Sequence, residues 1–79
     1  MNIINGIRSY VLDNELKITI LKNKIDILNY TDIGHFDDEK IIIKTNYKDI
    51  IIKGNDLVVS KLMKDEILIT GDFTNIELR

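Results

Sequence analysis

The sequence contains no cysteine, no proline and no tryptophan, and His35 is its only histidine. Without cysteine, no disulfide can stabilise this chain of 79 residues, and one histidine without thiolates is too few ligands for a structural zinc site. No apolar run approaches the roughly 18–20 residues that a membrane-spanning helix needs, and the N-terminus lacks the pattern of a secretory signal. Stability is therefore expected from a dense aliphatic core, from association between copies, or from both.

The chain has no strong excess of either charge, because 11 basic and 13 acidic residues are interspersed along it. There is no basic stripe, and the three Tyr and two Phe residues are scattered, so we expect no nucleic-acid partner. The alternative of a small β-barrel that binds a ligand or nucleic acid would need a basic groove lined with aromatic residues. We expect a cytoplasmic protein without direct membrane insertion.

Isoleucine is abundant, at 17 of 79 positions, and this β-branched residue favours strands. From Glu15 onward, apolar and polar residues alternate with the period of two that is typical of a strand. The alternating segments, separated by short polar turns, predict strands at 16–20, 25–27, 40–45, 50–53, 57–62, 66–70 and 73–78.

The connections predict an all-β fold, because they are too short for the helices that join parallel strands. We expect turns at 21–24, 46–49, 54–56 and 64–65, and a break at Gly71-Asp72. Residues 29–40 are expected to form a loop or an irregular edge, with Tyr30, Ile33 and Phe36 turned inward. The resulting small antiparallel meander would form a sandwich, a roll or a partly open barrel.

The N-terminal residues follow a different pattern from the rest. Ile3, Ile7 and Val11 recur every four residues, which predicts a short helix or an irregular arm over 1–14. The single domain of 1–79 then consists of this arm and a β domain over 15–79.

One face of the predicted sheet is aliphatic throughout. Its expected core residues are Ile41, Ile43, Ile50, Ile52, Leu57, Val59, Ile67, Ile69, Ile76 and Leu78. The opposite face should be polar if it meets water, yet it carries Ile42, Ile51, Val58 and Leu68. We expect these four to form one apolar row and a contact face. The N-terminal stripe, the hairpin of residues 16–28, a second sheet, another copy or a partner could cover it.

Catalytic chemistry is not expected, because no residue pairs a nucleophile with a base. His35 lies in a polar segment beside the acidic run Asp37-Asp38-Glu39, where a histidine is usually exposed or paired with a carboxylate. The acidic run lacks the spacing of a calcium-binding loop. We predict no catalytic, metal-binding or cofactor-binding residues.

An ordered series of short motifs resembles the YabP/YqfC family of sporulation proteins over about residues 16–79. The motifs are Phe36-Asp37, Ile41-x-Ile43-x-Thr45, Ile50-x-Ile52-x-Gly54, Leu57-x-Val59, Ile67-x-Ile69-x-Gly71 and Phe73-x-x-Ile76. Asn29-Tyr30 and Val58 are closer to the YqfC branch. Lys48 departs from the family pattern, which usually has glycine in that turn.

This resemblance implies a non-enzymatic protein made in the mother cell during spore formation. Genes of this family often lie beside one for a membrane protein. We therefore expect a small interaction module of spore morphogenesis, which either forms homo-oligomers or docks on a sporulation membrane protein. Its expected location is the mother-cell cytoplasm, with membrane association only through that partner.

Overall fold

The structure is a computed structural model that describes residues 8–11, by their backbone only, and residues 16–79. Within these residues the chain forms seven strands and no helix. The strands are β1 (Arg8–Val11), β2 (Lys17–Ile20), β3 (Lys24–Leu28), β4 (Asp32–Phe36), β5 (Lys40–Lys44), β6 (Ile50–Leu62) and β7 (Glu66–Leu78). All neighbours pair antiparallel in one open sheet of order β1-β2-β3-β7-β6-β5-β4. The predicted all-β class and antiparallel pairing are confirmed.

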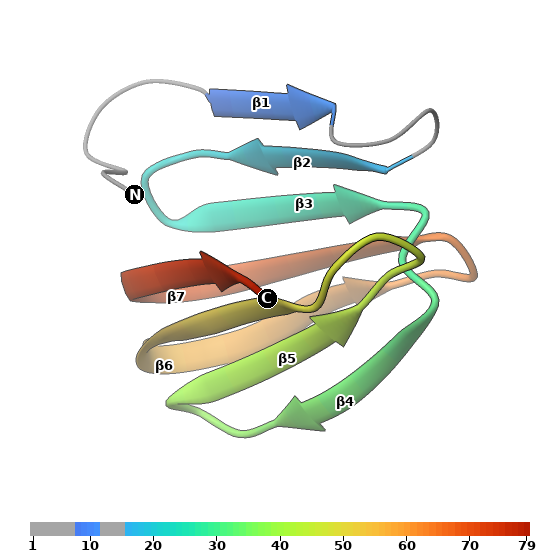
Figure 1. The fold of residues 1–79 in the computed structure, drawn as a ribbon. Helices are drawn as coiled ribbons and strands as arrows, with labels where there is room; N and C mark the ends of the chain where they lie inside the picture. Colours follow the sequence, from blue (N-terminus) through green and yellow to red (C-terminus); the bar gives the residue numbers. More distant parts are fainter. Residues whose placement is uncertain (1–7, 12–15) are drawn as a thin grey trace.

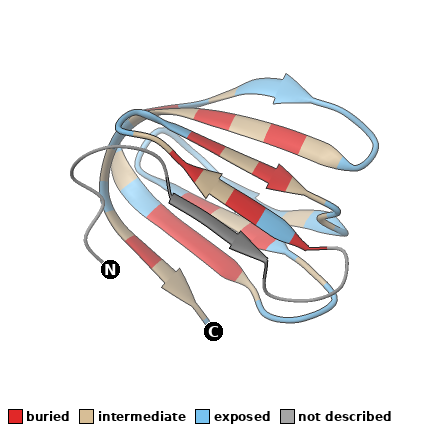
Figure 2. Cartoon of the chain, turned by 90° about the horizontal axis from the view of Figure 1, so that it is seen from above, coloured by how far each residue is buried: buried red, intermediate tan, exposed pale blue. Residues whose placement is uncertain are grey.

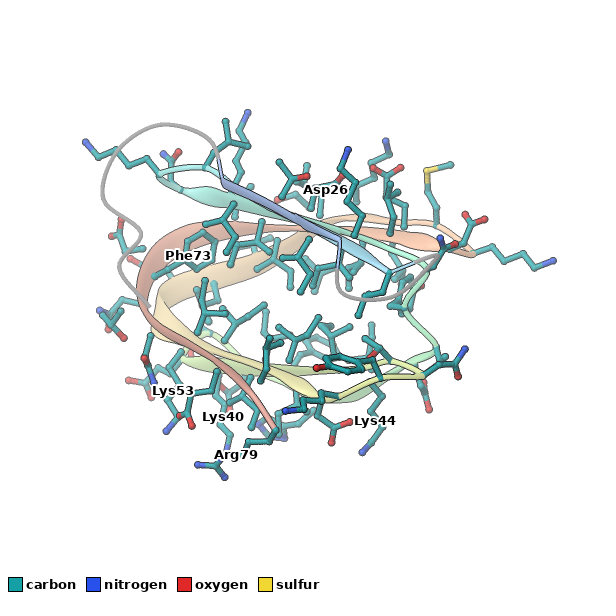
Figure 3. The ribbon with its side chains drawn as sticks, turned by 45° about the horizontal axis from the view of Figure 1, so that its top comes forward. Asp26, Lys40, Lys44, Lys53, Phe73 and Arg79 are labelled. Carbon is teal, nitrogen blue, oxygen red and sulfur yellow. The ribbon has the colours of Figure 1, made fainter. Side chains whose placement is uncertain are left out.

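The single sheet folds over on itself, because β6 and β7 are long strands that bend together (Figure 1). The second half of β6 and the first half of β7 join β1, β2 and β3 in an upper layer, which consists of residues 8–11, 16–28 and 58–70. The first half of β6 and the second half of β7 join β4 and β5 in a lower layer, which consists of residues 32–53 and 73–78. The two layers enclose the core between them (Figure 3).

The bend depends on two glycines and on register shifts between β6 and β7. The pairing shifts between Lys53 and Gly54 and again between Asn55 and Val58, which marks β-bulges. A Cβ on Gly54 would lie 2.0 Å from the backbone oxygen of Asp72, so the two bends approach too closely for any side chain there. Gly71 has a φ of 143°, which L side chains rarely adopt.

The predicted turn at 54–56 and the break at Gly71-Asp72 are therefore wrong. These residues bend two continuous strands instead of separating four short ones. A bulge adds one residue to a strand, which increases its twist without ending the ladder. It also changes which residues face inward, so Ile50 and Ile52 share a face with Leu57 across the bend.

The core consists of aliphatic side chains from β2, β3, β5, β6 and β7, together with Leu16 just before β2. Buried and partly exposed residues alternate along these strands, as Figure 2 shows. All ten predicted core residues lie in this cluster or, for Val59 and Leu78, pack against it. The core also contains Leu16, Ile18, Ile20, Ile25 and Ile27 from the segment of residues 16–28.

Two predictions at the edges of the sheet have different outcomes. Arg8–Val11 pairs with β2 as strand β1, so the helix expected at the N-terminus is wrong for these residues; the rest of that arm lies outside the described residues. Of the two alternatives for residues 29–40, the irregular edge is confirmed. It contains the edge strand β4, whose pairing with β5 shifts between Ile33 and His35.

Candidate interaction surfaces

Ile42 and Ile51 lie side by side on the outer face of the lower layer. They are direct cross-strand partners in the β5–β6 register, and Glu77 of β7 is opposite Ile51 on its other side. Ile42 is half-buried, and only 8% of Ile51 is exposed. The pair is therefore a small apolar area that is already partly covered within one chain.

Basic side chains surround this pair of isoleucines. Lys40, Lys44, Lys53 and Arg79 all extend from the lower layer (Figure 3). Lys44 Nζ lies 3.2 Å from Asp49 Oδ2, and Arg79 Nη2 lies 3.2 Å from Glu77 Oε2. Long cationic side chains cover neighbouring apolar groups with their methylene stems. We call Lys40, Lys44, Lys53 and Arg79 the basic face.

Val58 and Leu68 belong to a different surface, the outer face of the upper layer. Val58 is 54% exposed and lies opposite Thr70, whereas Leu68 is half-buried between Asp26 of β3 and Lys61 of β6. The expectation of one continuous apolar row is therefore wrong. The bend of β6 and β7 places one pair of residues on each outer face. Nor do residues 16–28 cover the row, because their apolar side chains enter the common core.

An acidic pair, not anticipated from the sequence, lies beside Leu68. Asp26 and Glu66 share a side-chain hydrogen bond, and Oδ1 of Asp26 is buried without a partner. Burial, followed by the hydrogen bond and charge of Glu66, raises the pKa of Asp26 from 3.8 to about 6. The hydrogen bond from Asp26 and the charge of Lys61 lower the pKa of Glu66. Asp26 is therefore the carboxyl of this pair that takes up a proton first as pH falls, and Oε1 of Glu66 lies 3.4 Å from Nζ of Lys61.

His35 and Asp37 form an exposed pair at the turn between β4 and β5. Nε2 of His35 lies 2.8 Å from Oδ2 of Asp37, while Oδ1 of Asp37 accepts hydrogen bonds from the backbone N–H groups of Glu39 and Lys40. These three contacts lower the pKa of Asp37, with His35 the largest cause. The arrangement holds the turn in place, and its hydrogen bonds account for both side chains without a substrate.

Phe36 is the most exposed large apolar residue among those described, at 65%. We expected it to turn inward with Tyr30 and Ile33, and this is wrong for Phe36 alone, since the other two pack against the core. Phe36 ends β4, which is an edge strand of the sheet, so no other strand among the described residues covers it. The edges β1 and β4 also present backbone groups that an added strand could pair with.

The described residues contain neither a candidate metal-binding cluster nor a candidate membrane-spanning helix. None of their histidine, aspartate and glutamate side chains gather in threes in an arrangement that could hold a metal ion. None of their segments is a helix that is long and apolar enough to span a membrane.

The chain is similar to one known family of proteins over most of its length. The model of the YabP family matches residues 13–79, which covers every described strand except β1. No curated protein and no solved structure matches the chain.

Proposed function

The chain belongs to the YabP family, and from this membership we propose that it is a sporulation protein that works by binding other proteins. The family match over 13–79 carries this proposal. The protein acts as a non-enzymatic β module in spore morphogenesis. It works in the mother-cell cytoplasm, by self-assembly or by docking on a sporulation membrane protein.

The outer faces of the sheet support a binding role. The core already contains buried side chains from both layers, so Ile42, Ile51, Val58 and Leu68 are additional apolar residues outside it. Val58 contributes the most exposed surface of the four. Apolar groups surrounded by polar ones are typical of protein–protein interfaces, and the exposed edge strands add backbone donors and acceptors.

A genetic experiment in the organism that encodes the chain tests the sporulation role. Deletion of the gene should lower the yield of heat-resistant spores, and the wild-type gene should restore it. Normal yield and normal spore morphology after deletion would contradict the proposal.

Complementation with variants tests the contact residues. Val58→Lys should fail to restore spores if the upper outer face binds a partner, because a charge on an exposed contact opposes docking. Lys64→Glu is a matched control, since Lys64 is an exposed turn residue outside the proposed contacts. Circular dichroism of both purified variants should match the wild type. Full complementation by Val58→Lys would remove this face from the proposal.

A further inference from the structure

Two neighbouring surfaces, one on the lower layer and one at the bend, carry charges that are not neutralised locally. The first is the basic face. On the basic face, Asp32 lies opposite Lys44, Asp49 pairs with Lys44 and Glu77 pairs with Arg79, so the excess positive charge lies at Lys40 and Lys53. The second, which we call the acidic bend, consists of Asp38, Glu39, Asp56 and Asp72, all exposed. None of these four carboxylates forms an ion pair with any residue that the structure describes.

Backbone contacts hold the acidic bend together. The N–H of Leu57 donates to the backbone oxygen of Asp38 at 2.9 Å, and the N–H of Gly54 donates to that of Glu39 at 3.0 Å. These bonds join the β4–β5 turn to the bulge of β6, and Asn55 in that bulge is paired with Asp72 of β7. Lys22 and Lys24 in the turn that contacts Gly71 offset part of the charge. The acids are therefore gathered by the fold.

The basic face contains an unfavourable pair. Lys40 and Lys53 are direct cross-strand partners, and like charges in such positions repel. Lys40 has no ion pair among the described residues. Nζ of Lys53 lies 4.0 Å from Oε1 of Glu77, and Glu77 also pairs with Arg79. An anionic group placed over Lys40 and Lys53 would remove this repulsion.

We propose that the chain forms a two-fold dimer in which the acidic bend of each copy lies on the basic face of the other. The two surfaces adjoin at Glu39 and Lys40, so an axis near this junction brings opposite charges together twice. Two-fold contacts are self-complementary in this way and are the commonest among homo-oligomers. This inference rests on the proposed function, because it specifies the self-assembly route.

The basic face also supplies an apolar group for the interface, because Ile42 is half-buried within it. Phe36, although exposed, lies opposite the buried Ile41, on the inner side of β4, and is not part of this contact. In the dimer, the acidic bend of one copy covers Ile42 of the other. An apolar centre with a charged rim is the usual arrangement of a specific interface.

Sedimentation velocity of the full chain tests the dimer. We expect a species of twice the 9.2 kDa chain mass, with a dissociation constant of about 1–100 µM at low salt. The constant should rise about tenfold or more between about 50 mM and about 500 mM NaCl, because salt screens exposed charges. A monomer throughout, or a dimer indifferent to salt, would overturn the inference.

Charge reversal tests the pairing of the two surfaces. Lys40→Glu with Lys53→Glu, and separately Asp38→Lys with Asp72→Lys, should each give monomers. An equimolar mixture of the two variants should form dimers again, which also shows that both fold. The control, Lys17→Glu with Lys64→Glu, makes the same change of charge as the lysine variant at exposed positions of the upper layer, and it should stay dimeric. If the control loses the dimer equally, or the mixture stays monomeric, the pairing is wrong.

These outcomes are separable from failure of the proposed function. A monomeric wild type in solution, with spores lost on deletion of the gene, removes the dimer and leaves docking on a partner protein. A dimer with normal spores after deletion keeps the inference and removes the sporulation role.

Discussion

Replacing Gly54 with alanine should destabilise the fold severely, because Gly54 is where the two bent strands approach most closely. A Cβ at this position would lie 2.0 Å from the backbone oxygen of Asp72, 2.9 Å from its carbonyl carbon and 3.0 Å from Cα of Phe73. All three atoms belong to the backbone of β7, so no side-chain rotation can relieve the overlap. The bends must separate by about 1.4 Å to bring this contact from 2.0 Å to an ordinary van der Waals distance.

The expected loss of unfolding free energy follows from this overlap. Forced overpacking costs about 1–3 kcal/mol and occasionally more, and a backbone overlap belongs at the upper end, at about 3 kcal/mol. A domain of this size has a total stability of roughly 4–12 kcal/mol. At about 4–8 °C per kcal/mol, the melting temperature of Gly54→Ala should fall by roughly 12–24 °C.

Urea unfolding and thermal melts followed by far-ultraviolet circular dichroism measure this loss, with Gly34→Ala as the matched control. A Cβ on Gly34 would meet Cε of Lys44 at 3.1 Å, and this atom is near the end of an exposed, flexible side chain. Gly34→Ala should therefore remain within about 0.5 kcal/mol of the wild type. Equal stabilities of the two variants would refute the account of the bend.

Three further predictions address other parts of the molecule. The pKa of Asp26 is raised from 3.8 to about 6, so between these pH values the folded state binds more protons than the unfolded state. The contribution of Asp26 to the free energy of unfolding therefore falls as pH rises from about 4 to 6. Asp26→Asn should remove this contribution and be more stable than the wild type at pH 7.5, on the order of 1 kcal/mol after solvent screening; urea titrations showing an equal difference between the two proteins at pH 4 and 7.5 would contradict it. Ile67→Ala should cost about 2–5 kcal/mol because Ile67 is fully buried, whereas Val58→Thr on the exposed outer face should cost less than about 0.5 kcal/mol, as measured by the same titrations. Tyr30→Phe should cost about 1 kcal/mol, since it removes the hydroxyl that donates to the backbone oxygen of Met63 at 2.6 Å, and an unchanged urea midpoint would show that this bond contributes nothing.

Several features of the fold were predictable because they depend on local order along the chain. Alternation of apolar and polar residues identifies the inner face of each strand, since successive side chains of a strand point to opposite sides. The turns at 21–24, 46–49 and 64–65 follow from polar residues between alternating segments. The structure places all three between strands, except that Lys24 is already the first residue of β3. The edge character of 29–40 follows in the same way from its polar residues and Gly34.

Other features were not predictable, because glycine and polar residues at a bend resemble those of a turn. Gly54 and Gly71 supply backbone conformations or close approaches that a hairpin turn also requires. The two strands are seen to continue through the bend together only because β6 pairs with β7 on both sides of it. The candidate surfaces depended on this point, because a flat meander would align Ile42, Ile51, Val58 and Leu68, whereas the bent strands separate them.

The sequence by itself determined that this chain is an antiparallel β protein, that ten apolar residues between 41 and 78 lie in or against its core, and that apolar residues remain on the other side of its strands. Only the tertiary structure decided that β3 pairs with β7, which brings Asp26 to Glu66, and that the acids of the bend gather beside the basic face. Alternation reflects the geometry of each strand alone, whereas the choice of neighbours reflects competition among all strands for burial and backbone hydrogen bonds.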